Sequence, residues 1–281
     1  MLLLFACAST DTADSKPPVD TAYDWPDAPV PTEVIGWVEV VEQPASAYAR
    51  LAVEFWAGKL PSTQEVVTTD GDCTLLVGPT MNQWDCDPVC DYGTQACIAG
   101  ECVDYPALAP AGTVTVTGLA PGDAVLDPSG GRYGIPSGYD GELFGAGDVI
   151  RVTSTGGDTP ALDLDARGVE TLQAATESYS FTPGDPFAVT WTTPTTGAPS
   201  RIRLLLETGW HGSPSLTTIW CETDDDGELT VPASLTTEFP IPSCGECEMS
   251  ELQRFTRDVV DFGQGPIELL VASELSFVPW W

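Results

Sequence analysis

Residues 201–206 read Arg-Ile-Arg-Leu-Leu-Leu, while residues 113–117 and 187–191 read Thr-Val-Thr-Val-Thr and Phe-Ala-Val-Thr-Trp. Polar and apolar side chains alternate in all three segments. Because successive side chains of a β-strand point to opposite faces of a sheet, this period of two predicts strands with one buried side. By the same reasoning we expect further strands over residues 34–41, 50–56, 64–69, 73–77, 148–154, 216–221, 228–231, 253–262 and 266–277.

The predicted fold class is all-β, with antiparallel β-sandwich domains and an embedded disulfide-rich segment. Turn-forming pairs such as Asp70-Gly71 and Asp226-Gly227 separate the expected strands. Many short strands at this spacing favour a sandwich or barrel over a parallel sheet. The 27 glycines and 25 prolines of the 281-residue chain also favour turns, and a hydrophobic content of 42% is enough to bury a core.

The charge of the chain is strongly negative. It has 42 acidic residues and 10 basic residues, a formal net charge of −32. Such a field repels nucleic acids and therefore excludes an electrostatic DNA or RNA binder. It keeps the protein in solution and attracts cations or cationic partners, so we interpret it as a solvated acidic surface.

The start of the chain carries a specific motif. Leu4, Phe5, Ala6 and Cys7 follow three apolar residues and precede a polar run, and this order resembles the lipobox of bacterial lipoproteins. The resemblance implies that Cys7 becomes the lipidated first residue, with no aspartate behind it to retain the protein at an inner membrane. The leader lacks Lys and Arg and is short, which a start upstream of Met1 would explain.

The stretch behind this cysteine is rich in Asp, Thr, Ala and Pro and has no apolar period. Such a segment cannot bury enough surface to order itself, so residues 8–33 are expected to form a disordered acidic tether. No later stretch has 18 consecutive apolar residues, so the expected membrane contact is the lipid anchor alone. The implied location is the cell envelope, at the outer membrane or the cell surface.

Cysteine usage points to an oxidising compartment, because eight cysteines remain once the lipobox cysteine is set aside. Five lie within residues 73–102 and three within residues 221–247, so complete pairing within the chain requires at least one bridge between the two groups. Such a bridge would close a loop worth about 4 to 5 kcal/mol in the chain-entropy model, while the full connectivity stays open. The eight predicted disulfide cysteines are Cys73, Cys86, Cys90, Cys97, Cys102, Cys221, Cys244 and Cys247.

Two cysteine segments have rival interpretations. The segment CDPVCDYGTQACIAGECV at residues 86–103 looks like a small disulfide knot, and its spacing does not reproduce a paired zinc ribbon. The pair Cys244 and Cys247 forms a C-x-x-C motif, but Glu246 and Glu248 would raise the pKa of a thiolate and so oppose redox reactivity. Structural disulfides are therefore preferred to zinc or redox chemistry in both segments.

The last hundred residues resemble an immunoglobulin or fibronectin type III sandwich. Trp191 lies in an alternating strand facing the expected core, Cys221 ends a strand, and Asp226-Gly227 forms a hairpin turn. The Cys-Trp-Cys order of a true immunoglobulin domain is absent, so the resemblance implies the sandwich without that subfamily. The expected regions are 1–7 (lipoprotein signal), 8–33 (tether), 34–80 (N-terminal β region), 81–105 (Cys-rich knot), 106–177 (middle β region) and 178–281 (immunoglobulin-like sandwich).

Candidates for chemistry are few, and no catalytic residue is assigned. The single histidine, His211, has Ser213 and Ser215 nearby but no G-x-S-x-G elbow, so a Ser-His-Asp device is not favoured. Asp224 and Asp226 lie in an acidic turn that could bind calcium. An EF-hand loop needs a glutamate at its twelfth position, but counting from Glu222 the twelfth residue is Ala233, so the motif is not matched. We therefore expect no cofactor apart from adventitious calcium at this turn.

Three functions are consistent with these features. We favour a lipid-anchored, non-catalytic binding or structural module of the cell envelope with a protein or glycan partner. The alternatives are an exported hydrolase that uses carboxylates on polysaccharide or peptide, and a calcium-stabilised adhesin. Two facing carboxylates in a deep cleft, one with a raised pKa, would favour the hydrolase.

Overall fold

The structure is a computed structural model of the 281-residue chain. It describes residues 23–29, 33–44, 48–61, 64–78, 86–91, 93–98, 100–134, 139, 141–175, 179–207, 217–240 and 250–277. Three predicted site residues lie outside these ranges, namely Cys7, Cys244 and Cys247, and so does His211, which the sequence analysis considered and did not favour.

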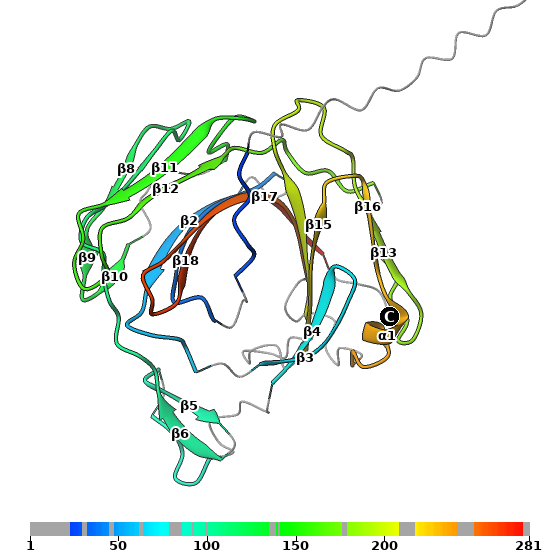
Figure 1. The fold of residues 1–281 in the computed structure, drawn as a ribbon, viewed down its shortest axis with the longest axis horizontal. Helices are drawn as coiled ribbons and strands as arrows, with labels where there is room; N and C mark the ends of the chain where they lie inside the picture. Colours follow the sequence, from blue (N-terminus) through cyan, green and yellow to red (C-terminus); the bar gives the residue numbers. More distant parts are fainter. Residues whose placement is uncertain are drawn as a thin grey trace, which may run out of the picture.

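An eight-stranded sheet forms the centre of the fold, in the order β2-β1-β18-β17-β14-β15-β4-β3 (Figure 1). The all-β prediction is confirmed. The sheet is mixed, because β1 and β18 pair in parallel while all other neighbouring strands of the sheet pair antiparallel. Strands from the regions 34–80 and 178–281 therefore share one sheet. Its strands are β1 (Gly36–Gln43), β2 (Tyr48–Phe55), β3 (Glu65–Asp70), β4 (Cys73–Val77), β14 (Arg201–Glu207), β15 (Thr217–Asp224), β17 (Ser250–Asp261) and β18 (Pro266–Phe277).

Two smaller layers cover one face of this sheet at opposite ends. A four-stranded sheet in the order β12-β11-β7-β8 packs on one half of the large sheet. A two-stranded sheet of β13 and β16, together with a short helix, packs on the other half (Figure 1). The elements of these layers are β7 (Val114–Thr117), β8 (Ala124–Leu126), β11 (Val149–Ser154), β12 (Asp163–Arg167), β13 (Phe187–Thr190), β16 (Glu228–Val231) and α1 (Ala233–Thr236). The remaining strands form two small hairpins, β5 (Gln95–Ile98) with β6 (Glu101–Asp104) and β9 (Pro128–Ser129) with β10 (Arg132–Tyr133).

The alternating segments supply the two hydrophobic cores. In β14 the apolar residues Ile202, Leu204 and Leu206 are fully buried and belong to the core beneath β13 and β16. Trp191 is buried in the same core, as its pattern predicts. In β7 the residue Val116 is fully buried in the other core, beneath the four-stranded sheet. Period-two alternation thus places each apolar face between the layers.

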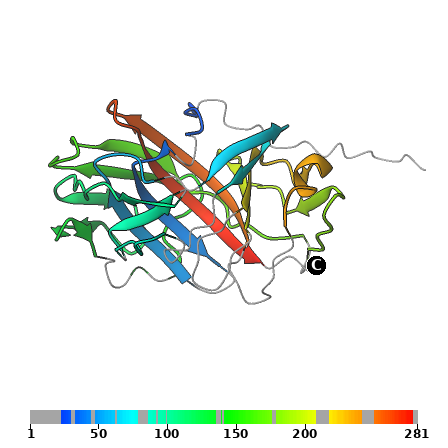
Figure 2. The ribbon, with the colours of Figure 1, turned by 90° about the horizontal axis from the view of Figure 1, so that it is seen from below.

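Strands β17 and β18 connect the two halves of the molecule. They are twelve residues long and run from the side of the four-stranded sheet to the side of β13 and β16 (Figure 2). Ile267 and Val271 of β18 lie in the first core, whereas Leu275 packs against the second, together with Leu252 of β17. One long hairpin therefore contributes to both cores.

The described part of the chain contains three disulfides, and one of them joins the two cysteine groups, as complete pairing of the odd-numbered groups requires. Cys73 of β4 bonds to Cys221 of β15 over a sequence separation of 148 residues. The two residues are directly opposite in the antiparallel pair, with Cα atoms 4.0 Å apart. The bridge therefore fastens the N-terminal part of the sheet to its C-terminal part.

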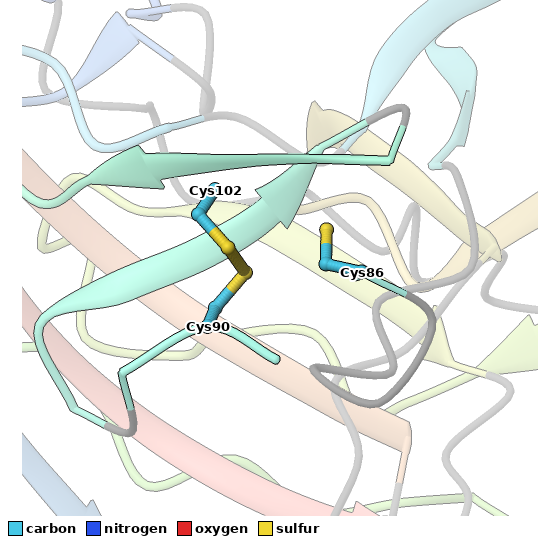
Figure 3. A group of neighbouring side chains, drawn as sticks. All are labelled: Cys86, Cys90 and Cys102. Carbon is cyan, nitrogen blue, oxygen red and sulfur yellow. A yellow bond between two sulfur atoms is a disulfide. The ribbon is translucent and has the colours of Figure 1, made fainter. Parts of the chain in front are cut away.

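The other two disulfides lie in the Cys-rich knot. Cys86 bonds to Cys97, and Cys90 bonds to Cys102, whose side chains lie beside Cys86 (Figure 3). The three sulfur atoms of Cys86, Cys90 and Cys102 lie within 4.8 Å of one another. Because each belongs to a disulfide, these sulfur atoms are not thiolates and do not form the zinc site considered for this segment.

Part of the predicted tether contacts the folded body. Trp25 packs edge-on against Phe255, with ring centroids 6.0 Å apart. The guanidinium group of Arg201 lies over the ring of Trp25. The hydroxyl of Tyr23 donates a 2.5 Å hydrogen bond to the backbone carbonyl of Arg257, and burial raises the pKa of Tyr23 to about 12. These two aromatic side chains have enough apolar surface to dock, which the polar composition around them concealed.

Candidate functional site

The candidate site is the face of the eight-stranded sheet that the two small layers leave uncovered, here called the inner face. It carries the residues that alternate with the buried apolar ones, such as Arg203 between Ile202 and Leu204. Such positions are expected to be polar and exposed in a sheet with one buried side. On the inner face, however, several of them are charged and buried.

Four charged residues from four strands form an ion-pair tetrad on this face. They are Arg203 of β14, Glu222 of β15, Arg257 of β17 and Glu268 of β18, each at most 9% exposed. Nη2 of Arg203 lies 2.9 Å from Oε1 of Glu222 and 2.8 Å from Oε1 of Glu268. Nη1 of Arg257 donates to Oε1 of Glu222 at 3.0 Å, and Nη2 donates to its other oxygen.

The tetrad is electrically balanced and flanked by aromatic rings. Burial alone would raise the pKa of Glu222, but Arg203 and Arg257 outweigh burial and hold that pKa below its usual value. The guanidinium carbon of Arg203 lies 4.3 Å from the ring centroid of Trp220 and 4.9 Å from that of Phe255. The charges of the two arginines and two glutamates therefore balance, although Nε of Arg257 is buried without a hydrogen-bond partner among the described residues.

A second group, here called the glutamate cluster, lies at the end of β17 and β18 on the same face. Glu274 of β18 is 1% exposed, and its Oε2 accepts a 2.8 Å hydrogen bond from Nε2 of Gln253. The same nitrogen lies 3.2 Å from Oε2 of Glu251, so the two carboxylates share one amide. Arg50 of β2 reaches Glu39 at 3.0 Å and Glu274 at 3.5 Å.

The charges in this cluster are unbalanced. Glu39, Glu251 and Glu274 share Arg50 among the described residues of the cluster. Burial raises the pKa of Glu251 to about 7, with the charge of Glu274 as the next cause. Burial also raises the pKa of Glu39. The cluster thus favours proton uptake at neutral pH.

The glutamate cluster does not have the geometry of a hydrolase pair. Glu251 has the raised pKa expected of a general acid, but a hydrolase needs a second carboxylate that reaches the substrate. The side chain of Glu274 is 0% exposed and is held by Gln253 and Arg50. A carboxylate in this position has no surface with which to contact a substrate.

The acidic turn behind the calcium prediction is organised around its middle residue. Asp225 is buried and accepts hydrogen bonds from Nε of Arg254 at 2.6 Å, Nε1 of Trp191 at 2.7 Å and the hydroxyl of Ser200 at 2.6 Å. Within the described part of the chain, Asp224 and Asp226 do not converge with a third acidic, histidine or cysteine ligand. Asp225, the residue between them, is committed to Arg254, Trp191 and Ser200.

The buried ion pairs could not be predicted from the sequence, because the residues of one strand do not indicate which strand lies beside it. One signal was available, namely that only 10 of 281 residues are basic. Arg203, Arg254 and Arg257 all lie within predicted strands and are buried with acidic partners. In a chain with so many acids, an arginine in a strand is a candidate for a buried ion pair.

Comparisons with known proteins add no functional assignment. No family model matches the chain, and no curated protein matches its sequence. Within the described ranges, no helix has the length and apolar character needed to cross a membrane.

Proposed function

We propose that the chain is an exported, lipid-anchored module of the cell envelope that binds a partner without transforming it. The observation that carries this proposal is the set of three disulfides. Disulfides form and persist in oxidising compartments outside the cytosol. The lipobox-like sequence Leu4-Phe5-Ala6-Cys7 supplies the matching signal for export and anchoring.

The docked aromatic residues support a tethered arrangement. Tyr23 and Trp25 hold the first described segment against β17 and β14. Sixteen residue steps separate Tyr23 from Cys7, and a fully extended chain of that length spans roughly 55 Å. A lipid on Cys7 would therefore keep the folded body within that distance of the membrane surface.

A binding role fits the charged residues better than catalysis. The tetrad is neutral and its members are committed to one another, and Glu274 is committed to its neighbours. A net charge of −32 disfavours nucleic acid and favours a protein or glycan partner that presents positive charge. The calcium-stabilised adhesin is less favoured, because Asp225 is occupied by Arg254, Trp191 and Ser200.

Replacing Cys7 by alanine is expected to move the protein from the membrane fraction to the soluble fraction. The lipobox resemblance implies that the lipid is attached to the thiol of Cys7. Alanine has no thiol, so the variant cannot be lipidated at this position and loses its membrane attachment. The measurement is immunoblotting of separated membrane and soluble fractions from bacterial cells that express the full chain. A Cys7→Ala variant that still pellets with membranes would refute the anchor.

The matched control is Ser9→Ala, two residues away. This variant should stay in the membrane fraction, because it leaves Cys7 intact. Mass spectrometry of the N-terminal fragment should give the mass of a lipidated Cys7 in the wild type and in Ser9→Ala. An unmodified thiol at that position in the wild type would contradict the proposal.

A further inference from the structure

The amide of Gln253 contacts two of the three glutamates of the cluster, Glu251 and Glu274, through its nitrogen alone. Gln253 is 3% exposed, and its Nε2 donates to both Glu251 and Glu274. Its Oε1 is buried, and no described residue donates a hydrogen bond to it. A buried acceptor without a donor costs free energy. A proton on a neighbouring group, or another hydrogen-bond donor, would therefore stabilise Oε1 of Gln253.

The charges around Glu251 identify that donor. The ionisable groups that face it are Glu274 on β18, Glu39 on β1, Glu207 on β14 and Arg50 on β2. Acids outnumber bases among them, so a negative charge on Glu251 is opposed from three strands. A proton on Glu251 removes this repulsion and also provides an O–H group that the free oxygen of Gln253 can accept.

The cluster lies where two long strands end. Gln253 is directly opposite Glu274, and Glu251 is opposite Ser276, in the last four residue pairs of β17 and β18. Glu251 also pairs with Leu205 of β14. Repulsion between Glu251 and Glu274 therefore acts on the end of the hairpin that joins both halves of the molecule.

We propose that Glu251, Gln253 and Glu274 form a proton-operated latch that closes the ends of β17 and β18 while Glu251 is protonated and loosens them when it is charged. In the closed state one carboxylate, Glu274, remains charged beside Arg50. In the loosened state both carboxylates are charged and share the amide of Gln253, while Glu274 keeps a second hydrogen bond from the amide of Gln43. An exported module meets the pH of its surroundings directly, so the latch would respond to external acidity.

The first test measures the proton itself. Carboxyl carbon NMR of the wild-type chain, with glutamate labelled, should show Glu251 titrating near pH 7, as its raised pKa of about 7 implies. The Glu251→Gln variant assigns the signal by its disappearance. A Glu251 signal that titrates at the ordinary value of about 4.3 would overturn the proposal, and this result needs no variant that might alter the fold.

The second test measures the strand ends. Amide hydrogen exchange at residues 250, 253 and 274–277 is compared between the wild type and Glu251→Gln at the same pH, because the substitution leaves the intrinsic exchange rate of these amides unchanged. The amide that Glu251→Gln introduces mimics the protonated acid. The wild-type rates should match those of the variant at pH 4.5 and exceed them several-fold at pH 8, because the proton is lost as the pH rises through about 7.

The control is Glu65→Gln, an exposed position on the edge strand β3. It should leave the exchange at residues 250–253 equal to that of the wild type at every pH. A constant ratio between wild type and Glu251→Gln from pH 4.5 to pH 8 would overturn the latch. The outcome is independent of the lipid anchor, since both measurements use the folded chain in solution.

Discussion

Replacing Cys73 and Cys221 together by alanine is expected to lower the free energy of unfolding by about 5 kcal/mol. The bridge closes a loop with a sequence separation of 148 residues, and this restricts the unfolded chain. It also links β4 to β15 in the middle of the order β14-β15-β4-β3. Denaturant unfolding monitored by tryptophan fluorescence, with the other disulfides intact, measures the loss.

A second cysteine pair provides the matched comparison. Replacing Cys90 and Cys102 by alanine removes a loop with a separation of only 12 residues, for which the same model gives about 3 kcal/mol. If the loss follows the length of the closed loop, the first double variant must be the less stable of the two. Equal losses, or a smaller loss for Cys73 and Cys221, would contradict the entropic explanation.

The second large effect is expected at the ion-pair tetrad. Glu222→Gln should lower the free energy of unfolding by about 3 to 5 kcal/mol, because it leaves the buried Arg203 and Arg257 with too little negative charge. Glu228→Gln, at an exposed position on β16, should change it by less than about 0.5 kcal/mol. Urea unfolding at pH 7 compares the two variants.

Two further measurements separate the charge imbalance from a loss of packing. The double variant Glu222→Gln with Arg257→Met removes one charge of each sign and leaves Arg203 with Glu268, so it should be more stable than Glu222→Gln alone. The pKa of Glu222 is lowered, so the stability it contributes is present above the ordinary glutamate pKa and is lost as the pH falls through the lowered value. Glu222→Gln should therefore lose less stability in acid than the wild type does.

The strands were largely predictable from local pattern. The expected strand 73–77 coincides with β4, 228–231 with β16 and 266–277 with β18. These segments combine alternating or apolar runs with turn residues at both ends, so a short window of sequence contains the whole signal. Six strands were not predicted, namely β5, β6, β8, β9, β10 and β12. The two-residue strands β9 and β10 have no period to detect, whereas β12 does alternate, with Leu164 and Ala166 buried, and was overlooked.

The neighbours of each strand were not predictable in the same way. The parallel pairing of β1 with β18 joins residues more than 200 positions apart, and no local pattern encodes it. The same holds for Arg203 and Glu268, whose ion pair spans 65 positions. Alternation predicted that Arg203 points away from the apolar core, which is correct, but not that other strands would bury it.

The tether illustrates a different limit. Composition over residues 8–33 predicts disorder because acidic and proline residues dominate, yet Tyr23 and Trp25 dock against Arg257 and Phe255. An average over 26 residues hides two aromatic side chains, and the surface that receives them exists only after distant strands have assembled.

The proposed function requires that the chain folds in an oxidising compartment around a bridge between its two cysteine groups. Peptide mapping of native, alkylated and unreduced protein by mass spectrometry tests it most directly. We expect the fragments carrying Cys73 and Cys221 to be covalently linked and to separate on reduction. Recovery of both fragments as separate, alkylated peptides before reduction would contradict it.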